Sequence, residues 1–399
     1  MPALAVEKSF HLTVDAGKHD RSNTPVRVLI ELPRELAKAK GVALVDPDGN
    51  KQVAQLTAPA LLNQQDKGKS GSVVRELHFV LSELGKGKRL ELTATVSSEE
   101  ATAADGFSWE RVRDQYEELC FGSRPVMRYV CQPFDQSSEE IAKATFRVFH
   151  HLYNPAGTRL VTKGPGGKYQ HHRGLFFSYN NINYGSAKRV NPWAGPGYGD
   201  AFETHEEFLD QEAGPVVGRH QVAIDWHEND KKVFVKEKRE MTVYNVPGGT
   251  LVEFATRVAS TVGKVELRGN VHHSGFQFRA DDEVATKTNK LTYYVRPDGR
   301  GEQGTFINEI PNLPWDAMSF VLAGKRYTVA LLGHPANAKE TIWGERNYGR
   351  FGTSFPYDLD EGKDLTVKYR VWLQDGEMTV DQVAALHADF SEPVQITVK

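Results

Sequence analysis

Histidine and arginine side chains gather in a few short segments of this 399-residue sequence, and such groups transfer protons, bind metal ions or hold anions. The segment richest in them runs from Thr162 to Phe177 and reads TKGPGGKYQHHRGLFF. Its glycines permit a loop whose backbone approaches a ligand closely. His171, His172 and Arg173 follow, directly before an apolar strand. We predict catalytic roles for both histidines and a substrate contact for Arg173. The alternative is a packed loop whose side chains bond to backbone carbonyls.

The next segment, residues 191–207, begins with a loop rich in proline and glycine that carries Trp193. An aromatic face at such a position can pack against a sugar ring, so we expect Trp193 to contact substrate. His205 follows among glutamates and is a candidate proton-transfer group. If a divalent metal is bound, the expected ligands are His171, His172 and His205. A solvated acidic turn is the alternative for the glutamates.

Two later segments add polar groups to the candidate site. Alternation along residues 271–280 places His273 and Gln277 on one face of a strand, as a polar strip with no role in the core. Residues 341–352 carry Glu345, Arg346 and Tyr348 among three glycines. We predict that Tyr348 is a second acid or base and that the other four residues bind substrate. An exposed sheet face and a surface salt bridge are the alternatives.

Other chemistries lack their sequence signals. The motifs GxSxG, HExxH and GxxxxGK[ST] and the EF-hand spacing are absent from the sequence. We therefore expect neither a nucleotide nor a haem as cofactor, and a bound divalent metal remains an open alternative. Cys120 and Cys131 allow one disulfide at most, and their spacing does not fit a thiolate zinc site.

The elements that must position these groups are mainly strands. Apolar and polar residues alternate with a period of two over many short runs, among them 221–226, 233–244, 252–258 and 365–373. Short helices are expected over 33–40, 114–120 and 379–388. Strands and helices do not alternate, so a parallel doubly wound sheet is not expected. The fold class is predicted to be all-β with antiparallel sheets.

A small, polar stretch at residues 97–106 suggests a boundary between two domains. We predict a small β-sandwich over residues 1–105. Residues 106–399 show no clear linker, and two broad sheets sharing one core would accommodate a domain of this length. This large domain carries the candidate site.

Composition excludes some partners. Lys and Arg number 49 against 52 Asp and Glu, for a net charge of −3, so the electrostatic footprint of a nucleic-acid binder or a polybasic membrane-surface protein is missing. No apolar run approaches the roughly 20 residues that a membrane-spanning helix needs. The start, MPALAVEKSFHLTV, does not read as a signal peptide.

The sequence resembles a known family through five motifs. They are RPVMRY at 124–129, FHHLYNP at 149–155, TKGPGGKYQHHRGLFF at 162–177, HHSGFQFR at 272–279 and YGRFG at 348–352. These motifs resemble the bacterial family known as "methane oxygenase PmoA", which is common in carbohydrate-degrading bacteria. The resemblance covers about residues 110–390. The chain departs from the family pattern at one place: it has Asn-Pro-Trp at 191–193, where the family has Asp-Phe-Trp-His.

This resemblance implies export from the cytoplasm and a carbohydrate substrate. The large domain is similar in character to the antiparallel supersandwich of galactose-mutarotase-like proteins. The leading hypothesis is a carbohydrate-active enzyme that performs β-elimination, glycosidic hydrolysis or epimerisation in a concave cleft. A glycan-binding protein without catalysis is the second hypothesis. A metal-dependent oxygenase with clustered histidines is the third.

Overall fold

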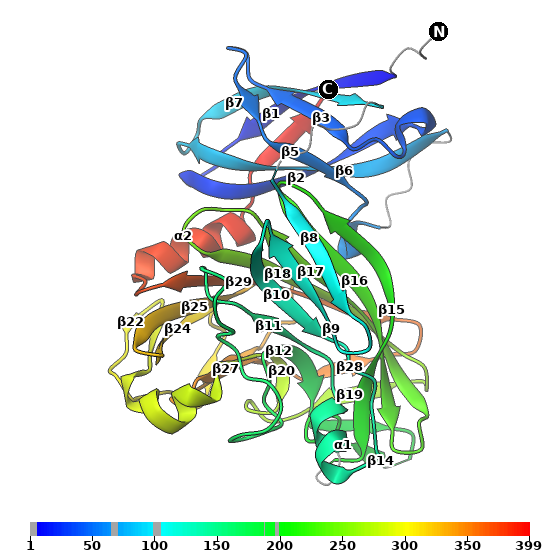
Figure 1. Cartoon of the computed structure of the whole chain (residues 1–399), viewed down its shortest axis with the longest axis vertical. Helices are drawn as coiled ribbons and strands as arrows, with labels where there is room; N and C mark the ends of the chain where they lie inside the picture. Colours follow the sequence, from blue (N-terminus) through cyan, green and yellow to red (C-terminus); the bar gives the residue numbers. More distant parts are fainter. Residues whose placement is uncertain (1–5, 65–70, 99–104, 187, 196–198) are drawn as a thin grey trace.

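Alternating strands form antiparallel sheets over most of the chain, as the sequence predicts. The computed structural model describes residues 6–64, 71–98, 105–186, 188–195 and 199–399. Figure 1 shows two stacked parts, with a small sandwich at the end that holds both termini and a larger sandwich below it. The all-β fold class is confirmed.

The small sandwich pairs two sheets around one apolar core that includes Leu12, Leu77 and Phe79. Its five-stranded sheet has the order β30 (Gln395–Val398), β1 (Glu7–Asp15), β7 (Arg89–Ser97), β3 (Gly41–Val45) and β4 (Lys51–Gln52). Its three-stranded sheet has the order β2 (Arg21–Pro33), β6 (Ser72–Leu84) and β5 (Ala54–Thr57). The last strand of the chain, β30, pairs with β1. The C-terminus thus joins this sheet, whereas the sequence assigned it to the large domain.

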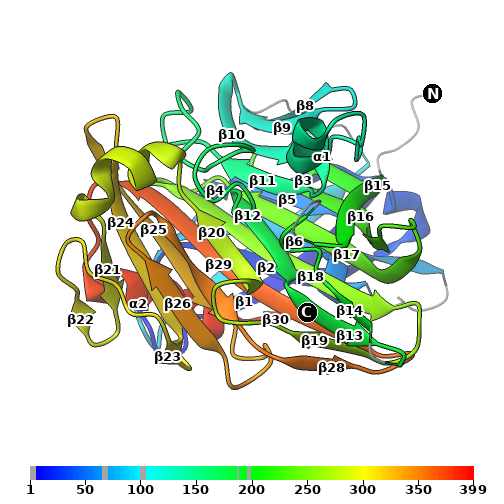
Figure 2. The same ribbon diagram turned by 90° about the horizontal axis from the view of Figure 1, so that it is seen from below.

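The large sandwich is built from two nine-stranded sheets. We call the first the β20 sheet; its order is β23 (Ile310–Pro311), β26 (Ile342–Arg346), β27 (Arg350–Ser354), β20 (Ser274–Arg279), β12 (Leu175–Tyr179), β11 (Phe149–Leu152), β10 (Arg124–Val130), β9 (Tyr116–Phe121) and β8 (Phe107–Val112). We call the second the β17 sheet; its order is β15 (Ala201–Ala213), β16 (Val217–Glu228), β17 (Val233–Tyr244), β18 (Thr250–Ser260), β29 (Asp364–Asp375), β25 (Lys325–Gly333), β24 (Trp315–Leu322), β21 (Tyr293–Arg296) and β22 (Gly299–Arg300). Figure 2 shows β11, β12 and β20 side by side.

The two large sheets share one core, and this decides which face of the β20 sheet is free for a site. Phe177 of β12 and Phe276 of β20 both pack on Phe254 of β18. Their neighbours Phe176 and Gln277 are register partners that point the other way, because side chains alternate along a strand. The β20 sheet therefore has an inner, apolar face and an outer face that carries the candidate site.

Smaller elements complete the large domain. A four-stranded sheet has the order β14 (Lys188–Val190), β13 (Asn181–Tyr184), β19 (Val265–Arg268) and β28 (Tyr357–Leu359). The α-helices are α1 (Glu139–Thr145) and α2 (Val380–Ser391). Single 3-10 turns lie at Arg34–Leu36, Leu61–Asn63 and Asn289–Leu291, and a π-helical turn lies at Val284–Thr288.

The helix predicted at the C-terminal end is confirmed as α2. Thr379 caps it by a reciprocal pair of bonds: Thr379 Oγ1 accepts from the Gln382 backbone N–H at 3.2 Å, and Gln382 Oε1 accepts from the Thr379 N–H at 2.9 Å. Val383 and Phe390 bury the apolar face of the helix. Figure 1 shows α2 between the small sandwich and the large one.

The expected helix at 114–120 is wrong, because residues 114–115 lie in a turn and the rest belong to strand β9, which pairs with β8 and β10 on its two edges. The expected helix at 33–40 is reduced to the 3-10 turn Arg34–Leu36. Most of the predicted boundary, residues 99–104, lies outside the described residues, so the domain limits stay a prediction. Both cysteines are free, with Cys120 buried and Cys131 partly buried. Within the described residues, every helix is too short or too polar to cross a membrane.

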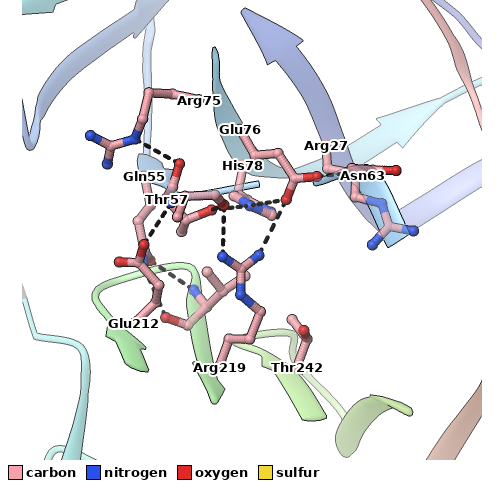
Figure 3. Close-up of polar contacts among 12 residues, drawn as sticks. Arg27, Gln55, Thr57, Asn63, Arg75, Glu76, His78, Glu212, Arg219 and Thr242 are labelled. Atoms are coloured by element: carbon pink, nitrogen blue, oxygen red, sulfur yellow. Dashed lines mark hydrogen bonds and ion pairs between the residues drawn. The ribbon is translucent and has the colours of Figure 1, made fainter. Parts of the chain in front are cut away.

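A buried polar network joins the small sandwich to the large one (Figure 3). Arg219 of β16 donates to Glu76 Oε2 at 3.2 Å and to the Ala58 carbonyl at 2.7 Å. Gln55 Oε1 accepts from the backbone N–H of Val217 at 2.8 Å. These groups are withdrawn from water and paired with one another, which favours one fixed arrangement of the two parts.

Candidate functional site

The loop between β11 and β12 is anchored to β20 by backbone hydrogen bonds. The Lys163 N–H donates to the Arg279 carbonyl at 3.0 Å, and the Gly174 N–H donates to the Lys163 carbonyl at 2.9 Å. Gly167 has φ +62°, and a Cβ there would lie 2.6 Å from Asp282 Oδ2. This exposed glycine is needed for the close approach of the loop to Asp282, rather than for the approach to a ligand that the sequence suggested.

Three histidines meet at this loop. One ring nitrogen from each of His171, His172 and His273 lies within 4.8 Å of the other two. The ring centroids of His171 and His172 are 4.3 Å apart, and those of His172 and His273 are 5.4 Å apart. His172 is buried, whereas the other two are partly exposed. We call these three residues the histidine cluster. The histidine cluster therefore offers ring nitrogens that can be reached from solvent.

Burial is the largest influence on the protonation of the cluster. Desolvation, aided by the charges of Arg350 and Arg346, lowers the pKa of His273 to about 4. Desolvation and nearby charges lower the pKa of His171 to about 3, and that of His172 also lies well below its usual value. All three imidazoles are therefore neutral at pH 7, and neutral rings accept protons or ligate metals.

An asparagine orients His273. Asn270 Oδ1 accepts from the His272 backbone N–H at 3.0 Å and lies 2.9 Å from His273 Nδ1. A backbone N–H only donates, which identifies this Asn270 atom as the oxygen and makes His273 Nδ1 the second donor. The lone pair of neutral His273 therefore lies on Nε2.

Two tyrosines flank the histidine cluster. The rings of Tyr169 and Tyr348 pack at an interplanar angle of 37° with centroids 4.6 Å apart, and each lies 6.4 Å from the ring of His172. Tyr169 is 42% exposed and has φ +55°, so the loop holds it in a conformation that is uncommon for a side-chain-bearing residue. Exposed aromatic faces beside polar groups suit a sugar, whose C–H faces pack on rings. The predicted Tyr348 thus lies at the site.

The expected substrate contact of Trp193 is not available in this structure. Trp193 is 1% exposed and packs on Phe176, with ring centroids 4.7 Å apart. Its ring meets those of His172 and His273 edge to face at 5.8 Å. Trp193 is therefore an inner wall that supports the histidine cluster. Tyr198, in the same loop, lies outside the described residues.

A polar chain forms the floor of the site. Arg350 Nη1 donates to Gln277 Oε1 at 2.6 Å, and Arg350 Nη2 donates to His272 Nδ1 at 2.7 Å. Gln277 Nε2 donates to the Ser274 carbonyl at 2.9 Å. Gln277 is completely buried, so it positions Arg350 and is not placed to bind substrate as the sequence predicted.

Arg346 lies on the outer face and is partly exposed, as a substrate-binding residue should be. It donates to Asn308 Oδ1 and to the Glu345 carbonyl. Glu345, the preceding residue on β26, points to the inner face and is completely buried. It forms an ion pair with Arg296 and accepts from the Ile307 N–H at 2.8 Å. The predicted substrate contact of Glu345 therefore does not fit, because alternation along the strand directs it into the core.

Arg173 also lies outside the site, because its side chain turns away from the cluster toward α1. The buried guanidinium donates to the carbonyls of Ala144 at 2.7 Å, of Gln170 at 3.2 Å and of Lys143. Two of these carbonyls belong to the last turn of α1, where such groups lack partners within the helix. Arg173 caps this helix, which is the packed alternative for this segment.

His205 belongs to a second group of rings. Its Nδ1 lies 3.3 Å from the Tyr129 hydroxyl, and its ring packs on Phe208 with centroids 4.3 Å apart. The nearby His150 and His220 share a hydrogen bond between their Nε2 atoms at 3.0 Å. The structure thus replaces His205 by His273 in the expected set of metal ligands. Its β15 position directs His205 toward β10.

The sequence reasoning missed three residues at the site. They are Asn270, Tyr169 and Arg350. The signal for Asn270 is its position two residues before His272, since an asparagine oxygen often accepts from the backbone two residues on. No comparable signal marks Tyr169, whose role depends on the ring of Tyr348 far along the chain.

A solved structure shares this architecture. The chain is similar to a glycosyl hydrolase family 38 protein from Enterococcus faecalis, with a TM-score of 0.50 and 9% identity over 98% of this chain and 47% of that one. It also matches an α-mannosidase from Enterococcus faecalis, with a TM-score of 0.46 and 10% identity over 100% of this chain and 46% of that one. The chain spans about half the length of these proteins. At such low identity, the first similarity shows a common fold.

A search of curated proteins gives no match. Residues 118–388 match the model of a family described as a family of unknown function, DUF6807. The matched region begins in β9 and ends in α2, and it contains the histidine cluster, both tyrosines and Arg350. The likeness to "methane oxygenase PmoA" stays a resemblance. The chain belongs to the family DUF6807.

Proposed function

We propose that this chain is an enzyme that acts on a glycoside or polysaccharide, with its reaction centre at the histidine cluster. The observation that carries the proposal is the meeting of His171, His172 and His273 beside the packed rings of Tyr169 and Tyr348. Neutral nitrogen donors supply the chemistry, and an exposed aromatic face supplies a surface for a sugar. The fold and the resemblance to a family from carbohydrate-degrading bacteria support this class of substrate.

Each side of the site has a distinct role in this proposal. The sugar ring lies on Tyr169, so that its polar substituents face the histidine cluster. Arg346 holds a hydroxyl or carboxylate of the substrate through the part of its guanidinium that faces solvent. Arg350, fixed by Gln277 and His272, places a positive charge behind the cluster and stabilises negative charge that develops during the reaction.

The reaction is elimination, hydrolysis or epimerisation, and product analysis separates these outcomes. We would incubate the full chain with a panel of glycosides and uronic-acid polysaccharides, with and without a chelator. An unsaturated sugar identifies elimination, a new reducing end without unsaturation identifies hydrolysis, and an isomer of unchanged mass identifies epimerisation. Export of the chain stays a prediction.

A matched pair of variants tests the location of the reaction centre. His171→Ala removes a partly exposed member of the cluster, so folding should survive, and we expect turnover to be lost. His205→Ala removes a partly buried imidazole of the second group, and we expect turnover to be retained. Equal activity of His171→Ala and the unchanged protein on a glycan that responds would refute this location.

The two other hypotheses give different results in the same experiment. Saturable binding of a glycan without any product indicates a glycan-binding protein. Oxygen consumption that depends on the glycan indicates an oxygenase, which would use the same histidine cluster. Either result contradicts the proposed hydrolase, lyase or epimerase activity.

A further inference from the structure

We infer that His171, His172 and His273 bind one divalent transition-metal ion through one ring nitrogen each. The inference concerns the same site as the proposed function. A catalytic role for the ion rests on that proposal, whereas the binding of the ion does not. The three nitrogens already lie within 4.8 Å of one another, so small movements of the rings bring them around one ion.

The hydrogen bond from His273 to Asn270 prepares one ligand. Histidines that bind metals usually donate their second ring N–H to an oxygen, which fixes the tautomer and the ring orientation. His273 Nδ1 does so, at 2.9 Å from Asn270 Oδ1. Asn270 is itself fixed, because the same oxygen accepts from the His272 N–H and its carbonyl accepts from the Ser274 hydroxyl at 2.8 Å. Nε2 of His273 is left with a free lone pair.

His172 provides a second, independent observation. Its side chain is 1% exposed, and Nδ1 is buried without a hydrogen-bond partner among the described residues. Buried polar atoms normally have a partner, and a bound ion beside this ring is one way to stabilise it. The backbone positions the pair of adjacent histidines: the His172 N–H donates to the Tyr169 carbonyl at 3.0 Å, and Arg147 donates to the His171 carbonyl at 3.2 Å.

The Nδ1 atom of the neighbouring His272 is not available to bind a metal ion. An arginine can only donate, so the bond of 2.7 Å from Arg350 Nη2 uses the Nδ1 lone pair of His272. Three ring nitrogens therefore remain for the ion. With three protein ligands, a coordination position is left for a substrate or solvent oxygen, which is the pattern of catalytic metal sites.

The donor set also indicates the kind of ion. Imidazole nitrogens suit zinc, copper, nickel and iron, whereas calcium and magnesium take oxygen ligands. No carboxylate belongs to the cluster, so the charge of the ion is not compensated by the protein. Arg350 and Arg346 add further positive charge nearby. An anionic oxygen, such as a sugar carboxylate, is therefore the favoured fourth ligand.

A second possible group of ligands, of which Glu206 is exposed, lies outside the histidine cluster and serves as a control. It consists of Glu206, Asp225 and His227. These groups already have protein partners: His227 Nε2 lies 2.7 Å from Thr204 Oγ1, and Asp225 forms an ion pair with Lys236 at 3.4 Å. We therefore expect no metal to bind there.

The test is a titration of the full chain with Zn²⁺ after treatment with a chelator, followed by calorimetry and by competition with a coloured chelator. We expect one Zn²⁺ per chain. His171→Ala and His273→Ala should each weaken binding by at least about tenfold, since even the loss of a group that orients a ligand costs this much. His227→Ala should bind like the unchanged protein, and Mg²⁺ should not compete.

Cobalt gives a readout besides affinity. Co²⁺ in place of Zn²⁺ should give a visible spectrum typical of nitrogen coordination, and His273→Ala should change this spectrum while circular dichroism shows an unchanged fold. The inference is overturned if the unchanged protein takes up no stoichiometric Zn²⁺. It is also overturned if the cluster variants bind as tightly as the unchanged protein, or if His227→Ala is the variant that loses the metal.

Failure of this inference is distinguishable from failure of the proposed function. Zinc binding that depends on the cluster, without turnover of any glycan, leaves the metal site standing and removes the proposed activity. If protein that is shown to be free of metal turns over a glycan, the proposed activity stands and the ion has no catalytic role.

Discussion

Asn270 Oδ1 lies 2.9 Å from His273 Nδ1, and this contact decides which nitrogen of His273 is available to a ligand. The asparagine oxygen is held by a turn of its own, in which it also accepts from the backbone of His272. The histidine cluster therefore includes one ring that is oriented before anything binds. A pre-oriented ligand loses less conformational freedom on binding, which favours affinity.

The role of Asn270 can be tested by a pair of substitutions. Asn270→Ala removes the acceptor, and we expect the affinity for Zn²⁺ to fall by about 10- to 100-fold. Asn270→Asp keeps an acceptor oxygen at the same place and should retain most of the affinity. The competition titration measures both. If Asn270→Ala and Asn270→Asp lose affinity equally, the oxygen does not orient His273.

Tyr169 should act on substrate binding rather than on the reaction itself. Its exposed ring lies on Tyr348, and contacts of aromatic rings are worth roughly 0.5–1.5 kcal/mol beyond area burial. Tyr169→Ala is therefore expected to raise KM roughly 2- to 10-fold with little change in kcat. Tyr169→Phe keeps the ring and should behave like the unchanged protein. A loss of kcat in Tyr169→Phe would show that the hydroxyl takes part in the reaction.

Arg173 should matter for stability instead of substrate binding. Arg173→Ala leaves the carbonyls of Lys143, Ala144 and Gln170 without their donor, and we expect a loss of roughly 2–4 kcal/mol in the free energy of unfolding. Urea denaturation measures this loss. The KM of the fraction that remains folded should be unchanged. A raised KM with normal stability would restore the substrate contact that the sequence suggested.

Glu345 and Arg346 are neighbours on β26 with opposite expected effects. Glu345→Gln leaves buried Arg296 without its carboxylate partner, which should cost roughly 3–5 kcal/mol of stability. Arg346→Ala removes a partly exposed side chain and should leave stability within about 1 kcal/mol. If substrate lies on the outer face, Arg346→Ala should raise KM about tenfold. Equal loss of stability in the two variants would contradict this division between the faces.

The contact between the two sandwiches should weaken in acid. Burial raises the pKa of Glu76, but the hydrogen bond to His78 and the charges of His78, Arg27 and Arg219 outweigh it and lower the pKa to about 2. Because the folded pKa is depressed, this group stabilises the folded state above the unfolded pKa near 4.5 and loses that effect as pH falls toward 2.

Glu76→Gln tests this dependence. The variant should be less stable at pH 7, and its midpoint of thermal unfolding should change less between pH 5 and roughly pH 2 than that of the unchanged protein, because the titrating carboxyl is gone. Glu7→Gln, at an exposed position on β1, is the control and should retain the full change. The same acid dependence in Glu76→Gln and in the unchanged protein would exclude Glu76 as its source.

The alternation of apolar and polar residues was enough to predict the fold class and much of the central sheet. Alternation over 221–226, 233–244, 252–258 and 365–373 predicted strands that the structure shows as neighbours β16, β17, β18 and β29. Such patterns are local, because one face of each strand must be apolar to meet a core. Local pattern failed at 114–120, where pairing with β8 and β10 outweighed any helical preference.

The sequence likewise identified the segments of the site, including His171, His172, His273 and Tyr348. Which of their side chains meet depends on how the chain folds. The fold turned Arg173 and Glu345 into the protein and moved His205 to another cluster. These outcomes depend on contacts between residues that lie 30, 49 and 76 positions apart along the chain. Residue type and spacing along the chain contain no information on where a neighbouring segment will offer a carbonyl, a carboxylate or a ring.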